Sequence, residues 1–119
     1  MPQYLLLLHE EPQVFADKSP AELQAIFERY IAWAGKLAQE GKLVGANKLE
    51  DRSGKSLRQV NGKLTVTDGP YTEGREVIGG YFLIEASSYE DAVSIGSECP
   101  HADFGVIEIR QVEPTGGDK

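Results

Sequence analysis

Four consecutive leucines stand at residues 5–8, inside the segment QYLLLLHE at residues 3–10. The side chains of a β-strand point alternately to its two faces, so an unbroken apolar run predicts a strand that is covered on both sides. Any fold of this chain must therefore place the segment in the middle of a layered structure. A sheet whose other face stays in water does not satisfy this strand.

A long helix is predicted after the first strand, in SPAELQAIFERYIAWAGKLAQEGK at residues 19–42. Ser19 is a favourable N-cap, Pro20 occupies a position where proline is common, and Glu22 completes a capping box. Gly41 is expected to end the helix. Gly35 costs about 1 kcal/mol relative to alanine inside a helix, which predicts that the helix packs closely on a sheet at this point.

A β-hairpin is the clearest local signal in the chain. Asn61-Gly62 separates two β-prone runs, and both residues tolerate the positive φ that a two-residue turn requires.

Ser88 is the expected N-cap of a second helix at residues 87–99. Besides the first strand, we expect strands at residues 42–50, 56–60, 63–67, 77–86 and 104–112.

This order of elements predicts one α+β domain over residues 1–119, with residues 114–119 as a frayed tail. The fold class is a ferredoxin-like βαββαβ sandwich with an inserted β-hairpin. Two helices cover only one face of such a sheet, so the leucine strand needs a cover on the other face. A second copy of the sheet would supply that cover, and we therefore expect a homodimer that forms an α+β barrel.

The charge of the chain limits its partners. Twelve Lys and Arg residues against 19 Asp and Glu residues give a net charge of −7, and the basic residues are scattered singly. Nucleic acid and anionic membrane are therefore not expected as partners. The N-terminal segment has no basic region before its short leucine run, and the chain has one cysteine, so a cytoplasmic location is expected.

The segment VTDGPYTEGREVIGGYFLIEA, at residues 66–86, resembles the DGPF signature of the YCII-related family, with Asp-Gly-Pro-Tyr at residues 68–71. The Gly79-Gly80 pair, the closing IEIRQVEP and the leucine-rich opening are also similar to that family. The resemblance implies a small bacterial dimeric α+β barrel whose biochemical role is unassigned. It also implies a link, for some members, to extracytoplasmic-function sigma factors as neighbours or fusion partners.

One branch of the family carries a His on the first helix and an Asp in an Asp-Pro pair after the second helix, proposed to act as a catalytic dyad. The corresponding positions here are Tyr30 and Cys99. The resemblance therefore does not carry this dyad over to the chain.

Several residues are candidates for a site, and each has a structural alternative. Asp68 could shape its turn or act as a general base. Gly79 and Gly80 could form a bulge or a close backbone approach, or could leave room for a ligand. Tyr71 is a further candidate for contact with a ligand. These alternatives stay open at this point.

Two further groups add to the candidates. His101, in Cys99-Pro100-His101, is the expected base if there is one, with Asp68 opposite, although a buried cysteine beside a helix-ending proline explains the motif as well. Tyr30 and Trp33 on the first helix are core residues by their spacing, but they could also line a ligand pocket. The chain offers too few ligands for zinc or haem, and we expect neither a metal nor a cofactor.

The sequence leaves two functions open. The first is a barrel that binds an unknown small molecule, with an unassigned enzymatic activity that uses His101, Asp68 and Tyr30 in an interfacial pocket. The second is a non-catalytic cytoplasmic module that binds a regulatory protein such as a sigma factor. The first predicts a partly apolar cavity with converging polar groups, and the second predicts a filled barrel with an exposed apolar patch.

Overall fold

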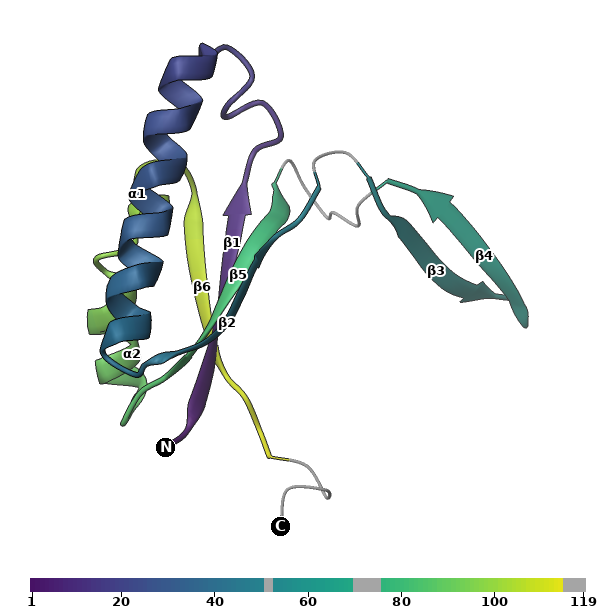
Figure 1. Cartoon of the computed structure of the whole chain (residues 1–119). Coiled ribbons are helices and arrows are strands. Elements are labelled where there is room, and N and C mark those ends of the chain that lie inside the picture. The colour runs from purple at the N-terminus through teal and green to yellow at the C-terminus, as the bar shows by residue number, and fades with distance from the viewer. Residues whose placement is uncertain (51–52, 70–75, 115–119) are drawn as a thin grey trace.

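The computed structural model describes residues 1–50, 53–69 and 76–114. Within these residues it contains six strands, two α-helices and one 3-10 helix (Figure 1). They are, in chain order, β1 (Gln3–Glu10), α1 (Pro20–Gln39), β2 (Leu43–Lys48), β3 (Lys55–Val60), β4 (Lys63–Asp68), β5 (Val77–Glu85), α2 (Tyr89–Gly96), the 3-10 helix η1 (Pro100–Asp103) and β6 (Val106–Gln111).

Four strands form one antiparallel sheet in the order β2-β5-β1-β6, while β3 and β4 pair only with each other. Figure 1 shows α1 and α2 on one side of the four-stranded sheet and the β3–β4 hairpin extending on the other side. This arrangement is compatible with the ferredoxin-like α+β class and confirms a small antiparallel α+β fold. The hairpin is an addition to it.

Strand β1 lies between two neighbours and faces both ways. Tyr4, Leu6 and Leu8 point to the helices and are buried in the core. Leu5 and Leu7 point to the opposite face and are only half-buried. The helices thus cover one face of the leucine strand, and the other face of the sheet is open in the single chain.

The predicted capping box of α1 is confirmed. The Ser19 hydroxyl accepts a hydrogen bond from the Glu22 backbone N–H at 3.1 Å, and the Glu22 carboxylate accepts one from the Ser19 N–H at 2.8 Å. Gly41 follows the helix with a φ of 75°, as expected for a helix end. The expectation for Gly35 is wrong: this residue does not pack closely on the sheet, and a Cβ atom there would meet nothing within 4 Å.

The predicted hairpin turn is also confirmed, because Asn61 and Gly62 have φ values of 52° and 79°. The remaining predicted elements are present within a few residues of their expected bounds. The predicted tail lies outside the described residues from residue 115 onward. Among the helices described, none combines the length and the apolar character needed to cross a membrane.

Candidate functional site

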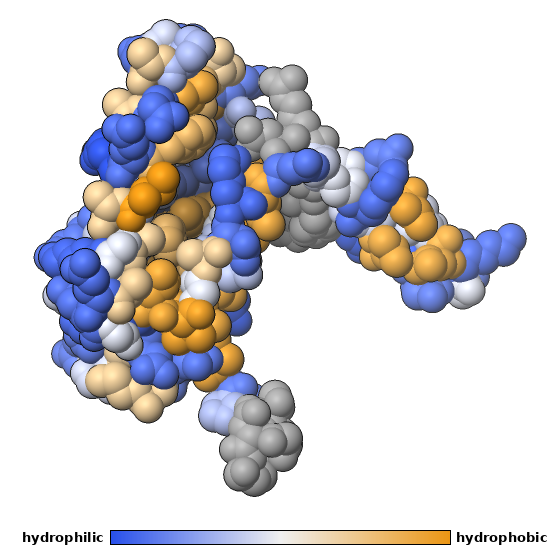
Figure 2. Space-filling view, in the orientation of Figure 1, coloured by the Kyte–Doolittle hydropathy of each residue, from blue (hydrophilic) through white to orange (hydrophobic). Residues whose placement is uncertain are grey.

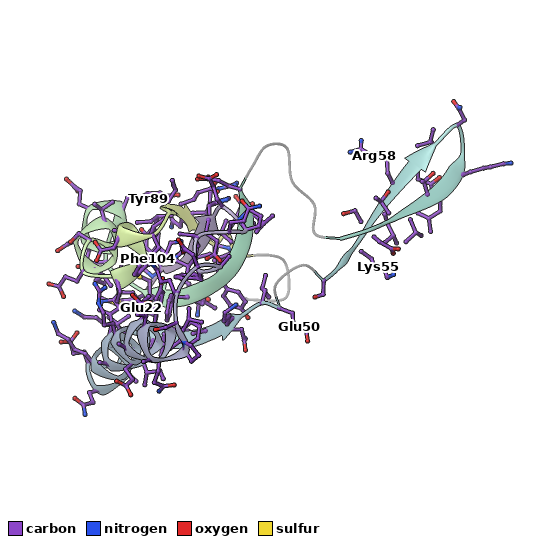
Figure 3. All side chains as sticks on the ribbon, turned by 90° about the horizontal axis from the view of Figure 1, so that it is seen from above. Glu22, Glu50, Lys55, Arg58, Tyr89 and Phe104 are labelled. Carbon is purple, nitrogen blue, oxygen red and sulfur yellow. The ribbon has the colours of Figure 1, made fainter. Side chains whose placement is uncertain are left out.

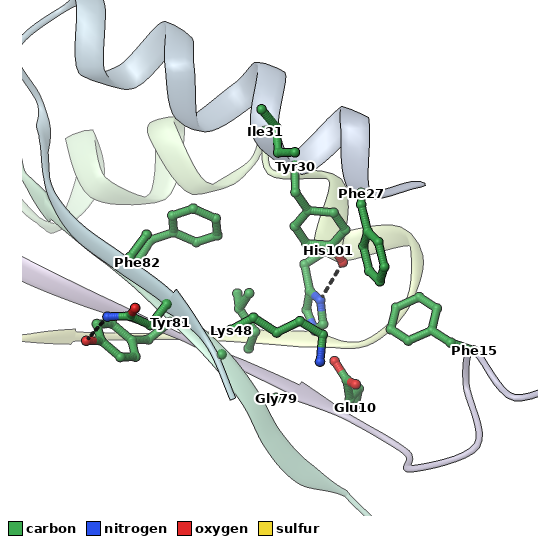
Figure 4. Close-up of a pocket in the computed structure, with 14 residues that line it drawn as sticks. Glu10, Phe15, Phe27, Tyr30, Ile31, Lys48, Gly79, Tyr81, Phe82 and His101 are labelled. Atoms are coloured by element: carbon green, nitrogen blue, oxygen red, sulfur yellow. Dashed lines mark hydrogen bonds between the residues drawn. The ribbon is translucent and has the colours of Figure 1, made fainter. Parts of the chain in front are cut away.

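A cavity of about 420 Å³ lies between the first half of α1 and the sheet (Figure 4). Most of its wall is apolar and aromatic, with Phe15, Phe27 and Phe82 among the lining side chains. Polar groups enter it from separate elements: Glu10 from β1, Tyr30 from α1, Lys48 from β2 and His101 from η1. A concave, mostly apolar space with a few convergent polar groups is typical of a small-molecule site.

Local periodicity explains how two elements supply this lining. Phe27, Tyr30 and Ile31 are spaced three and four residues apart on α1, so they share one face of the helix. Leu8 and Glu10 are two residues apart on β1, so both point to the helix side of the sheet. The cavity therefore lies at the end of β1 where the apolar run gives way to a carboxylate.

The glycine pair on β5 combines a bulge with two close approaches. Leu8 pairs with Gly80 and His9 pairs with Ile78, so Gly79 is the extra residue of a β-bulge. A Cβ atom on Gly79 would lie 2.6 Å from the Glu10 carboxylate, so the absent side chain leaves room for that carboxylate in the cavity. On Gly80 it would lie 2.9 Å from the Asn47 carbonyl oxygen. Both structural alternatives for the pair are thus realised, and both glycines also line the cavity.

His101 is held by hydrogen bonds on both ring nitrogens. Its Nε2 lies 2.8 Å from the backbone carbonyl oxygen of His9, and its Nδ1 lies 2.9 Å from the Tyr30 hydroxyl. A carbonyl oxygen can only accept, so Nε2 carries the proton, and Nδ1 accepts the hydrogen bond that Tyr30 donates. The imidazole is thus fixed in one neutral tautomer.

Burial acts on both members of this pair. It lowers the pKa of His101, whose side chain is almost fully buried, because a charged imidazolium loses its hydration there. It also raises the pKa of Tyr30, with smaller contributions from Cys99 and Glu10. Both shifts favour the neutral phenol beside the neutral imidazole over a phenolate–imidazolium pair.

The 3-10 helix η1 and the glycine that follows it place His101. Pro100 begins η1, and the chain then returns so closely to β1 that a Cβ atom on Gly105 would lie 2.0 Å from the His9 carbonyl oxygen. This contact brings the His101 ring within reach of the same oxygen. Cys99 precedes η1 in the core, where burial raises the pKa of its thiol and keeps it protonated.

Glu10 and Lys48 belong to the site, although neither was a candidate from the sequence. Glu10 is buried, and Figure 4 shows its carboxylate and the Lys48 ammonium group pointing toward one another. Strand parity carries a signal for Glu10, since it follows Leu6 and Leu8 on the same face of β1. Lys48 has no comparable signal, because its position depends on how β2 pairs with β5.

The structure brings some of the candidate residues together and leaves others apart. Tyr30, Gly79, Gly80 and His101 surround one cavity. Trp33 is a core residue outside the cavity lining and packs edge-to-face on Phe82, with the ring centroids 4.9 Å apart. Tyr71 lies outside the described residues.

Asp68 lies at the end of β4, away from the cavity. Its side chain is 85% exposed and forms an ion pair with Lys55 on the neighbouring strand. The chain therefore does not bring Asp68 and His101 together, and the residue that contacts the His101 ring instead is Tyr30.

A second polar cluster lies on the open face of the four-stranded sheet. The His9 ring and the Glu108 carboxylate are 2.8 Å apart, and Arg110 lies 3.6 Å from the other oxygen of that carboxylate. Glu108 and Arg110 therefore sit on the face turned away from the helices. In the part of the chain that the structure describes, no three His, Cys, Asp or Glu side chains gather as metal ligands would.

One solved structure with a similar fold is the 5-chloro-2-hydroxyhydroquinone dehydrochlorinase from Burkholderia phenoliruptrix AC1100, in complex with 2,5-dihydroxybenzoquinone. The TM-score is 0.52, the sequence identity is 14%, and the match covers 98% of this chain and 99% of that one. At this identity the likeness concerns the fold alone.

Sequence comparisons identify the family. An uncharacterized protein of Rhizobium meliloti (strain 1021) is 30% identical over 91 residues, which is 75% of this chain and 68% of that protein. The family model of the YCII-related domain matches residues 2–115. The chain therefore belongs to the YCII-related domain family.

Proposed function

We propose that this protein binds a compact, hydroxylated ring compound in the cavity between α1 and the sheet. One observation carries the proposal: the Tyr30 hydroxyl, fixed by its hydrogen bond to a buried neutral His101, lies in the wall of a largely aromatic cavity of about 420 Å³. A volume of this size suits a single small molecule.

The lining indicates the shape and chemistry of the ligand. Flat apolar rings pack well against Phe15, Phe27 and Phe82, which line different parts of the wall. Tyr30 donates its proton to His101, so its oxygen can accept a hydrogen bond from a ligand hydroxyl. The solved dehydrochlorinase, a protein of similar fold in complex with 2,5-dihydroxybenzoquinone, supports the same class of ligand.

Proton transfer is the reaction that these residues suit best. The buried Glu10 carboxylate is the strongest candidate proton acceptor among the described lining residues, since burial favours the neutral imidazole of His101 over its protonated form. Tyr30 and His101 would orient the ligand hydroxyl. An enzymatic activity of this protein would then be a proton abstraction or an elimination on the bound ring.

The active form in this proposal is a homodimer. Leu5, Leu7 and Leu83 are half-buried on the open face of the sheet, and two such faces packed together would complete the cover that the leucine strand requires. The wild-type chain should therefore sediment as a dimer at micromolar concentration. A monomer under these conditions would contradict this part of the proposal.

Isothermal titration calorimetry with hydroquinone and with 2,5-dihydroxybenzoquinone tests the binding site. Tyr30→Phe removes the hydroxyl and should weaken binding about tenfold, the usual effect of losing one hydrogen bond. Tyr89→Phe is the matched control, because Tyr89 lies outside the cavity lining and its hydroxyl oxygen accepts a hydrogen bond from the Gln111 backbone. Equal affinity of both variants for the ring compounds, or no binding of either compound by the wild type, would refute the proposed site.

The alternative function, a non-catalytic cytoplasmic module that binds a regulatory protein such as a sigma factor, is favoured by a different observation. The β3–β4 hairpin exposes apolar side chains to solvent. A regulatory module of this kind needs no internal cavity, however, and the cavity beside Tyr30 favours ligand binding.

A further inference from the structure

The β3–β4 hairpin has one apolar face and one polar face. Leu57 pairs with Val66 and Gln59 pairs with Leu64, so these four side chains share a face. The intervening pair, Arg58 with Thr65, faces the other way. At the base of the hairpin Lys55 and Asp68 share the face of Leu57, and Figure 3 accordingly shows Lys55 and Arg58 on opposite sides of the hairpin. The hairpin is therefore amphipathic.

The apolar face has no cover in the single chain. Leu57, Leu64 and Val66 are 62%, 57% and 57% exposed. An isolated two-stranded hairpin is marginally stable in water and needs another layer. The radius of gyration reflects how far the hairpin extends: it is 16.4 Å, whereas a compact domain of this length has about 13.5 Å.

The hairpin and the open face of the sheet border the same space. Figures 1 and 3 both show the hairpin extending on the side of the sheet opposite to the helices. We refer to the four-stranded sheet and its helices as the body. In Figure 2 apolar side chains gather along the lower side of the hairpin, next to the hollow between the hairpin and the body. The open sheet face contributes the half-buried Leu5, Leu7 and Leu83 to that space. A single occupant would thus cover both apolar surfaces.

The charges indicate what the occupant is. Residues 55–68 carry three basic side chains and one acidic side chain, a net charge of +2, while the whole chain carries −7. The remainder of the chain therefore carries −9. The hairpin and the remainder of a second copy thus carry net charges of opposite sign, which favours their association. The excess basic side chains, Arg58 and Lys63, lie on the face opposite to Leu57 and stay in solvent when the apolar face docks.

We propose that the β3–β4 hairpin is an exchanged arm, which docks by Leu57, Leu64 and Val66 on the body of a second copy of this chain. The inference rests on the homodimer of the proposed function and adds to it a contact outside the sheet-to-sheet interface. A two-fold axis makes the exchange reciprocal, so each protomer gives one arm and receives one. The assembly is therefore complete with two copies, in which both hairpins are docked.

Sedimentation velocity over a dilution series tests the arm. The triple variant Leu57→Thr, Leu64→Thr and Val66→Thr keeps β-prone residues and should raise the dissociation constant of the dimer at least about 100-fold. A matched pair of single variants controls for the possibility that the substitutions unfold the hairpin itself. Val66→Thr should raise the dissociation constant at least about tenfold, whereas the same change at Val60, on the polar face, should leave it unchanged.

A second measurement uses the unaltered chain. In a dimer assembled from one isotope-labelled and one unlabelled copy, isotope-filtered NMR should show contacts from the methyl groups of Leu57, Leu64 and Val66 to the other copy. The proposed arm is wrong if the wild-type dimer lacks these contacts, or if Val66→Thr and Val60→Thr dimerise with the same dissociation constant. Either result still allows a dimer that forms through the two sheets alone. A wild-type monomer overturns both, and the calorimetric test of the ligand site is independent of either result.

Discussion

Replacing Gly105 by alanine should damage the structure that positions His101. A Cβ atom there would lie 2.0 Å from the His9 carbonyl oxygen, whereas real Cβ contacts stay beyond 3.0 Å. The backbone of β1 would have to retreat by about 1 Å, and the 2.8 Å bond between His101 Nε2 and that oxygen would break. A buried imidazole N–H without a partner costs about 1–3 kcal/mol, and the displaced start of β6 adds to this. We expect a loss of about 3–5 kcal/mol in the free energy of unfolding, which is a large part of the total for a domain of this size.

Urea denaturation followed by circular dichroism measures this loss. Gly45→Ala is the matched control, because a Cβ atom at Gly45 meets nothing within 4 Å, and its free energy of unfolding should equal or exceed that of the wild type. The imidazole resonances of His101 provide an independent readout, since the tautomer should no longer be fixed in Gly105→Ala. A Gly105→Ala variant within about 1 kcal/mol of the wild type would refute the reasoning.

The pH response of His101 and two positions of α1 give further tests of stability. Burial lowers the pKa of His101 in the folded state, so the unfolded state binds more protons in acid. The free energy of unfolding, measured by urea titration, should therefore fall as the pH decreases through about 6.5. The fall should be less steep in His101→Asn, which lacks the titrating imidazole. Gly35→Ala should raise the free energy of unfolding by about 0.5–1 kcal/mol, since the site is helical and has room for the added methyl group. Ser19→Ala should lower it by about 1 kcal/mol through loss of the helix cap, and an unchanged thermal midpoint would contradict this.

The elements of the fold were predictable because their signals are local. The capping box at Ser19 and Glu22 and the turn residues Asn61 and Gly62 depend on neighbours within a few positions, and the structure confirms all of them. The leucine strand itself was predictable from its apolar run, but only its helix side is buried in the single chain, and the cover on its second face stays a prediction.

The site was less predictable because it depends on contacts between distant segments. Tyr30 and His101 were candidates, but their hydrogen bond joins residues 71 positions apart. Asp68 was expected opposite His101, yet it lies on a hairpin that extends from the body, and local patterns do not show where a hairpin points. The prediction that α1 packs closely on the sheet at Gly35 was wrong for a similar reason. The sequence shows that a glycine lowers the stability of a helix, but only the packed structure shows that no other group lies near it.

The position of Trp33 gives the molecule an optical reporter of its own. Trp33 is the single tryptophan of the chain, it is buried, and its indole ring stands almost perpendicular to Phe82, whose ring lines the cavity. A molecule that enters the cavity and shifts Phe82 changes the environment of the indole, while solvent quenchers do not reach it from outside. Intrinsic emission should therefore respond, through Phe82, to occupancy of the cavity, without a label and without any change to the sequence.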